Sequence, residues 1–295
     1  MNISSLKNKK WFWYTAYIIL LTVFFLYILF PSGLFTDFIK LEAEKNIPGI
    51  NVEIDKIRPS VMFGINISGL KISSDENPET AIFNSEKTSI SFSVIDLLKG
   101  RIKCRFKSAV KGGRISGFFS KKDKDNIDAL IEFKNINLDD KAFIHPVLNQ
   151  RIEGALKGKV LFSGDPGNPV KGNTELFMEL TRGRFKFKKT FFGINDIDVR
   201  GLDFSGEISN RKFLIKKLDL TGALMNGTAS GSIDLAEDLL ASRLNLKAEI
   251  EPSSALQHDN PDAGKALQLI ENKKKDGKFF LIIGGTIDKP LPKFK

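Results

Sequence analysis

INVEIDKIRPSVMFGINISGLKIS, residues 50–73, alternates apolar and polar side chains in two successive runs. Val52 and Ile54 point to one side of the first run, and Ile65 and Ile67 point to one side of the second. In an extended chain, successive side chains point to opposite faces, so alternation with a period of two is the signal of a half-buried strand. This stretch therefore predicts two strands with one apolar face.

The same alternation recurs along most of the chain. About twelve such runs can be counted after residue 50, and they are broken by Gly, Asn and Asp at intervals that suit hairpins. Helical periodicity is confined to four short segments. The fold predicted is mainly β, with an elongated or curved antiparallel-rich sheet and a few short helices. The four helical segments are residues 34–46, Val94–Lys99, Lys141–Leu148 and Ala263–Asn272.

The apolar side of such a sheet has to be covered. A second sheet, curling of the sheet on itself, a lipid or a partner protein would each remove it from water. The Pro/Gly cluster at Gly164–Gly172 either separates two β lobes or forms one long loop. Glycines inside the apolar runs, as in INISGLKI (65–72), indicate bulges or bends where the sheet curves.

The N-terminal segment predicts a membrane anchor. Residues 11–30 read WFWYTAYIILLTVFFLYILF and carry no charge. Twenty residues of helix rise about 30 Å, which matches the hydrocarbon core of a bilayer. All Trp and Tyr residues of the chain fall in this segment, as expected at a membrane interface. The anchor residues are Trp11, Trp13, Tyr14, Tyr17, Tyr27 and Phe30.

The charge around this segment sets its orientation. Lys7, Lys9 and Lys10 precede the span, which favours a cytoplasmic N-terminus and an exported remainder. A cleaved signal peptide is the alternative, but the apolar stretch exceeds the usual h-region and no A-x-A site follows it. The expected organisation is a cytoplasmic tail (1–10), a transmembrane helix (11–30), a juxtamembrane helix and linker (31–49) and a periplasmic β-rich domain (50–295). The helix at 34–46 would lie on the membrane or pack under the first strands.

Side chains for catalysis are scarce. His145 and His258 have no ligand-type neighbours at metal spacing, and Cys104 is the only cysteine. The carboxylate pairs Asp123/Asp125 and Asp139/Asp140 stand in polar segments, typical of solvated turns. No nucleophile elbow or phosphate-binding loop occurs. We therefore expect no enzyme, cofactor or metal, and the dispersed net charge of +10 does not favour nucleic-acid binding.

Several segments together resemble a known family. They are residues 50–73, IEGALKGKVLFSGDPGNPVKGNTELFMELTRGRF (152–185), KLDLTGALMNGTASGSIDLAEDLLASRLNLKAEIEPS (217–253) and DGKFFLIIGGTIDKPLPKF (276–294). With the preceding anchor, they are similar to the long bacterial form of the type II secretion system protein GspN family, which itself resembles AsmA- and TamB-type proteins. In that family, basic residues usually stand beside the proline that follows the Gly-Gly-Thr strand. Here Asp288 and Lys289 precede this proline, Pro290.

The resemblance implies a non-enzymatic accessory component of the type II secretion system. It would be a single-pass protein of the bacterial inner membrane that contacts other envelope secretion proteins by strand addition. The alternative is a lipid-binding or lipid-transport module of the AsmA/TamB type, with phospholipid or lipopolysaccharide as partner. Its groove would be lined by the same-face pairs Phe185 with Phe187 and Phe279 with Leu281, unless these pack against a second sheet.

Overall fold

The computed structural model consists of one long sheet and five α-helices. It describes residues 3–295 apart from 48, 61–62, 76, 111, 122–125, 139–150, 192–193 and 260. The strands are β1 (Ile50–Ser60), β2 (Gly64–Ser74), β3 (Asn77–Phe92), β4 (Lys103–Val110), β5 (Gly113–Lys121), β6 (Ile127–Asn137), β7 (Arg151–Gly164), β8 (Asn173–Phe191), β9 (Ile194–Ser209), β10 (Lys212–Gly222), β11 (Met225–Asp234), β12 (Arg243–Pro252), β13 (Lys274–Lys275), β14 (Lys278–Gly285) and β15 (Pro290–Phe294).

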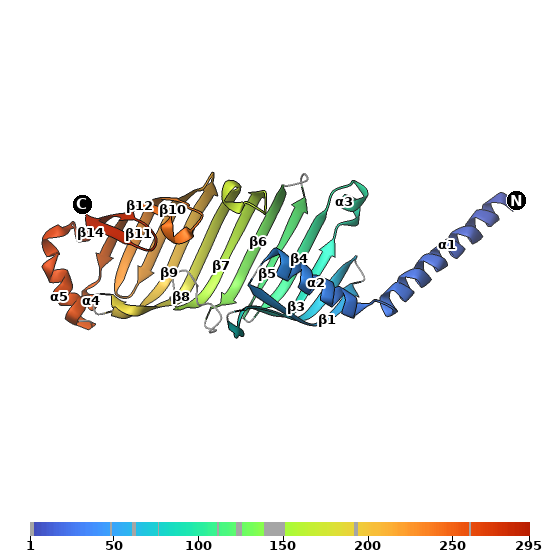
Figure 1. Cartoon of the computed structure of the whole chain (residues 1–295), viewed down its shortest axis with the longest axis horizontal. Helices are drawn as coiled ribbons and strands as arrows, with labels where there is room; N and C mark the ends of the chain where they lie inside the picture. Colours follow the sequence, from blue (N-terminus) through green and yellow to red (C-terminus); the bar gives the residue numbers. More distant parts are fainter. Residues whose placement is uncertain are drawn as a thin grey trace.

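The fifteen strands form a single antiparallel meander. Each strand from β1 to β12 pairs with the next one in sequence, β14 follows β12, and β13 and β15 both pair with β14 (Figure 1). Most of the connections are short, and a short turn between consecutive strands joins antiparallel neighbours. The prediction of a mainly β, antiparallel fold is confirmed. The Gly164–Gly172 stretch is the β7–β8 connection.

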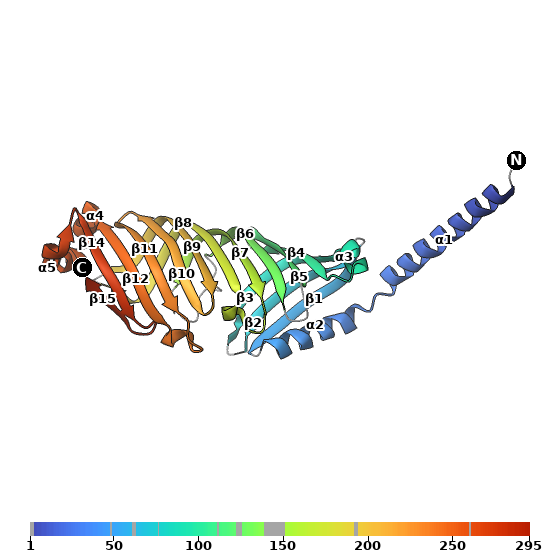
Figure 2. The ribbon, with the colours of Figure 1, turned by 90° about the horizontal axis from the view of Figure 1, so that it is seen from above.

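The sheet is elongated and twisted. Its strands lie across the long axis of the molecule, and the chain advances strand by strand from one end to the other (Figures 1 and 2). With about 4.8 Å between neighbouring strands, such a row measures roughly 60 Å. Local register shifts add curvature. At Gly154, where φ is +129°, the β7–β8 register shifts between Glu153 and Ala155, as expected for a bulge.

The helices lie at the two ends. α1 (Ile3–Ile28) and α2 (Ser32–Asn46) precede β1, α3 (Val94–Leu98) joins β3 to β4, and α4 (Ser254–Asp259) and α5 (Pro261–Leu269) follow β12. Single 3-10 turns are η1 (Pro169–Lys171), η2 (Leu239–Ala241) and η3 (Glu271–Lys273). The helices expected at 34–46, Val94–Lys99 and Ala263–Asn272 are present in slightly different bounds. The one expected at Lys141–Leu148 lies outside the described residues.

In the part of the chain that the structure describes, no helix is both long and apolar enough to cross a membrane. In α1, the side chains at positions 3–10, 19, 23 and 26 are not among the described residues.

Both edges of the sheet are protected against pairing. α2 packs along β1, where its Ile39 and Ala43 contact the cluster around Val52. At the other edge, the Lys295 N–H donates to the Phe280 carbonyl at 2.9 Å. The alternate residues of β15 therefore direct their backbone groups outward, and two of them are prolines without an N–H. Helix cover and outward prolines are the usual defences of edge strands.

Candidate functional site: the apolar face of the sheet

One row of cross-strand neighbours runs through the whole sheet without a polar side chain. Directly paired residues of neighbouring antiparallel strands share a face, so the register defines the row. It crosses every strand on the path from β1 to β12 and continues over β14 to β15. Its members are Pro59, Ile65, Ile90, Phe106, Gly117, Ile131, Val160, Leu176, Gly206, Ile215, Gly231, Leu246, Ile283 and Pro292.

Two further rows lie on the same face. The first contains Phe133, Met178, Phe204, Leu218 and Leu281. The second, nearer the α4–α5 end of the strands, contains Ile136, Leu156, Leu180, Leu202, Leu220, Ile250 and Phe279. We call the surface formed by the three rows the apolar face. The central row runs along the full length of the sheet, and the two further rows widen it from β6 to β14.

The apolar face is covered at its ends. Near β1, α2 closes a cluster of Val52, Ile54, Ile57 and Ile67. At the C-terminal end of β8 and the start of β9, α4 and α5 close a second cluster through Leu256 and Ala263.

Between these helices, from β4 to β8, the large side chains of the central row are only partly covered. Phe106, Ile131, Val160 and Leu176 are all half-buried. The described elements include a single sheet and no second one packed on it. A shallow, curved apolar surface therefore faces outward between two helical ends, and Phe119 in β5 is 39% exposed on it.

A small group of hydroxyls interrupts the apolar face near β3. Thr88 Oγ1 lies 3.0 Å from Ser85 Oγ and 2.9 Å from Ser108 Oγ, and Ser85 Oγ donates to the Ala109 carbonyl at 2.9 Å. Ser73 Oγ is fully buried and has no hydrogen-bond partner among the described residues. Ser85, Thr88 and Ser108 satisfy one another and are buried, so this group is part of the packing between β2 and β4.

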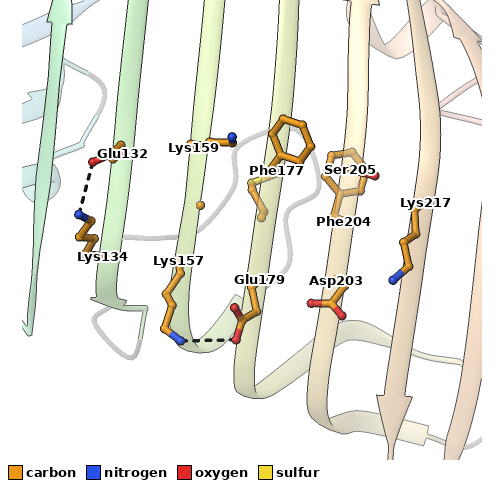
Figure 3. A pocket seen from close by; sticks show the side chains of 12 residues that line it. Glu132, Lys134, Lys157, Lys159, Phe177, Glu179, Asp203, Phe204, Ser205 and Lys217 are labelled. Atoms are coloured by element: carbon orange, nitrogen blue, oxygen red, sulfur yellow. Dashed lines mark ion pairs between the residues drawn. The ribbon is translucent and has the colours of Figure 1, made fainter.

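The opposite face is charged and faces water. A depression of about 480 Å³ lies on it over β6 to β10, and Figure 3 shows the side chains that line it. Lys134 pairs with Glu132 at 3.4 Å and Lys157 with Glu179 at 3.5 Å. Lysines and carboxylates neutralise one another here, and such exposed pairs contribute little to stability. This depression therefore presents no concentrated charge for an ionic ligand.

Two other contacts in the depression involve lysines. Lys159 Nζ lies 4.6 Å from the centroid of the Phe177 ring, a cation–π contact. A hydrogen bond to Asp219 and the charge of that carboxylate raise the pKa of Lys217, so this lysine stays protonated. A protonated amine cannot act as a base.

The groove residues predicted from the sequence fall mainly in covered parts of the apolar face. Phe185 packs against the clusters around Ile197 and Leu180. Phe279 is 3% exposed, and its ring meets that of Phe294 with centroids 5.9 Å apart. Leu281 shares their face. The side chain of Phe187 lies outside the described residues.

Sequence reasoning missed the residues at the open centre. Phe106, Phe162, Leu176 and Phe204 belong to the apolar runs, but only the cross-strand register places them on one face of the sheet. Leu176, Met178 and Leu180 recur at every second position and carried the signal. This pattern does not show which strands lie next to β8 in the sheet.

The residues predicted to anchor the chain lie on α1. Trp11, Trp13, Tyr14, Tyr17 and Tyr27 are exposed, each with at least half of its surface accessible. Phe30 instead stacks on Phe35 at a centroid distance of 4.7 Å and joins the α2–β1 cluster.

A cavity of about 1090 Å³ lies between α1, the start of α2 and the β1–β2 turn. Its lining includes Leu20, Phe25, Tyr27, Phe35 and Phe63, so it is almost wholly apolar. The apolar side chains of α1 thus adjoin the N-terminal end of the sheet.

The described residues contain no group of three His, Cys, Asp or Glu that would hold a metal ion. His145, Asp123, Asp125, Asp139 and Asp140 lie outside the described residues, as does the side chain of His258. Burial raises the pKa of the Cys104 thiol, which makes it a poor nucleophile at neutral pH. Comparisons of the chain with protein-family models, with curated proteins and with solved structures find no match.

Proposed function

We propose that this protein is a membrane-anchored lipid-binding module of the bacterial envelope, which holds acyl chains along the apolar face of its sheet. The observation that carries the proposal is the uninterrupted central row from Pro59 to Pro292, in which Phe106, Ile131, Val160 and Leu176 are half-buried between the helical ends. A soluble protein rarely leaves so long an apolar surface facing water. Its occupant should therefore be apolar and extended.

An acyl chain fits this description better than a compact ligand. It is linear, and each methylene that it withdraws from water contributes about 0.8 kcal/mol. Glycines of the central row leave room for the rings beside them: an added Cβ at Gly117 would meet the Phe106 ring at 2.9 Å, and one at Gly206 would meet the Phe213 ring at 2.7 Å. A surface of this length gives room for several chains in succession, since the row measures roughly 60 Å.

The anchor part of the proposal rests on α1. Residues 11–30 are uncharged and follow three lysines at positions 7, 9 and 10. Trp11, Trp13 and Tyr14 are exposed on the helix surface, as suits side chains at a lipid–water interface. We propose that α1 fixes the chain in the inner membrane with the N-terminus in the cytoplasm, and that residues 50–295 lie in the periplasm.

A photocrosslinking experiment tests the lipid part. Leu176 and Phe177 are adjacent in β8 but lie on the apolar and the charged face, respectively. Benzoylphenylalanine is placed at position 176 or at position 177 of the full chain. Living cells that make the protein are irradiated, and the crosslinked adducts are identified by mass spectrometry. Phospholipid or lipopolysaccharide adducts at position 176, and few at 177, support the proposal. Equal or absent lipid adducts at both positions refute it.

A second candidate is an accessory component of the type II secretion system. The segments that resemble the GspN family fall on β1–β2, β7–β8, β10–β12 and β14–β15, hence on both ends and the middle of the sheet. Because α2 and the β15 prolines protect the edges, a partner would contact a face or a strand end. Deletion of the gene in the source bacterium should trap type II substrates in the periplasm. Normal secretion would refute this candidate.

A further inference from the structure

The connection between β3 and β4 carries an exposed apolar tip. In α3, Leu98 is 84% exposed and Ile95 67% exposed, although both are large apolar side chains. The β1–β2 turn lies beside them, because the Phe92 N–H donates to the Phe63 carbonyl at 2.9 Å. We call these residues the apical patch. It consists of Phe63, Phe92, Ile95, Leu97, Leu98 and Ile102, all exposed.

Cations surround the apical patch. Lys99, Arg101 and Lys103 follow α3 directly. The one acidic group of the segment, Asp96, is engaged by Arg101 at 3.1 Å. A hydrogen bond from Ser93 and the nearby cations lower the pKa of Asp96, so its charge persists and offsets one cation. The segment from Ser93 to Lys103 is therefore net positive, with apolar side chains at its tip.

The apical patch lies at the end of the sheet from which α1 emerges. Both views place α3 at this end of the molecule (Figures 1 and 2). Phe63 also lines the cavity that contains Leu20 and Tyr27 of α1. If α1 enters a bilayer, α3 faces the surface of the same bilayer.

The corresponding connection at the far end of the sheet differs in charge. η2 joins β11 to β12 on the same side of the meander as α3, and Leu239 and Leu240 are exposed there. Its neighbours Glu237 and Asp238 are acidic. Exposed leucines thus occur at both connections, but cations accompany them only at the α1 end.

We propose that the apical patch inserts into the surface of the anchoring membrane and that Lys99, Arg101 and Lys103 bind its anionic headgroups. This inference rests on the anchor part of the proposed function. Apolar side chains that dip into the headgroup region, with cations beside them, are the usual design of interfacial attachment. A second contact beside α1 would hold the sheet upright on the membrane, with the N-terminal end of its apolar face at the bilayer.

Depth-dependent quenching in vesicles tests the inference with the full chain. The test variant is Leu98→Cys and the matched control is Leu239→Cys, each in a Cys104→Ser background. The single cysteine of each variant is labelled with an environment-sensitive nitrobenzoxadiazole probe. The protein is reconstituted in phosphatidylcholine vesicles with phosphatidylglycerol and brominated acyl chains. We expect a blue-shifted probe at position 98 that loses most of its fluorescence to bromine, and a probe at 239 that is unaffected. Lys99→Glu together with Arg101→Glu should reduce the quenching at position 98.

The same samples separate failure of this inference from failure of the anchor. Trp11 and Trp13 are the only tryptophans, so quenching of tryptophan fluorescence in unlabelled protein reports α1 alone. Quenched tryptophans with an unquenched probe at 98 would overturn the inference and leave the anchor intact. A blue-shifted but unquenched probe would indicate a protein contact and overturn it as well. Equal quenching at 98 and 239 would mean that the sheet lies flat, and unquenched tryptophans would refute the anchor itself.

Discussion

Cys104 in β4 lies directly across from Phe119 in β5, on the apolar face of the sheet. Beside this pair, the rings of Phe106 and Phe119 stack with centroids 5.5 Å apart. The only thiol of the chain therefore stands among the aromatic side chains that we assign to lipid binding. It is a natural reporter for that surface.

Labelling of Cys104 should be slow at neutral pH. Burial raises its pKa above the ordinary value of 9.0, and only the thiolate reacts. The rate of reaction with a soluble maleimide should therefore stay low through pH 8 and increase as the pH rises through the raised pKa. Unfolding in urea should restore the rate of a free thiol. A native rate at pH 7 equal to that of glutathione would contradict this account.

Extraction of lipid should change the same rate. If acyl chains cover the centre of the apolar face, they also shield Cys104, and delipidated protein should react faster than protein taken directly from membranes. The measurement is the ratio of the two labelling rates at constant pH. A ratio of one would indicate that nothing covers the β4–β5 region of the face.

Gly231 should not tolerate a side chain. Its φ is +140°, and an added Cβ would meet the Asn245 carbonyl oxygen at 2.3 Å. We expect Gly231→Ala to lower the free energy of unfolding by about 1–3 kcal/mol, measured by urea titration in detergent with far-UV circular dichroism. Gly201→Ala is the matched control, because an added Cβ there has no neighbour within 4 Å. Equal stabilities of the two variants would show that the central glycines are not required.

The α2–β1 cluster should contribute strongly to stability. Ile57 is 1% exposed at its centre, and truncation of a fully buried isoleucine to alanine typically costs about 2–5 kcal/mol. Ile57→Ala should show a loss in this range in the same urea titration. Ile95→Ala, which truncates an exposed side chain of α3, should stay within about 0.5 kcal/mol of the wild type. A comparable loss in both variants would argue against the packing of α2 on β1.

The prolines of β15 should keep the molecule from pairing edge to edge. Replacement of Pro290 and Pro292 by Thr restores two outward N–H groups on a strand that is exposed along its whole length. We expect the double variant to self-associate, as measured by light scattering of the detergent-solubilised protein. Lys293→Thr is the control, because the backbone of residue 293 already faces β14. A monomeric double variant would show that the prolines do not guard the edge.

The sequence was sufficient for the fold class because alternation with a period of two depends only on neighbouring residues. It predicted the strands around Val52 and Ile67, the helices α2, α3 and α5, and a sheet with one apolar face. It did not predict which apolar side chains are neighbours, since that depends on cross-strand register and on bulges such as the one at Gly154.

The choice of groove residues shows the same limit. The sequence predicts Phe185 and Phe279 as members of same-face groove pairs. In the structure Phe185 is partly buried at the end closed by α4 and α5, and Phe279 is buried beside Phe294. Leu176 and Phe106, which lie at the open centre of the apolar face, are not among the groove residues predicted from the sequence. Helices that fold back over a sheet leave no trace in the strand pattern, so the sequence cannot separate covered from open parts.

The central claim is that the apolar face carries lipid, and the lipid content of the released sheet tests it most directly. A protease site is inserted between Pro31 and Ser32, and the domain is cut from membranes and purified without detergent. Native mass spectrometry of the wild-type domain should then find phospholipid or lipopolysaccharide bound in stoichiometric amount. The Leu176→Asp variant should bind less lipid, and the Phe177→Asp variant should bind as much as the wild type. A monodisperse domain without lipid would contradict the account.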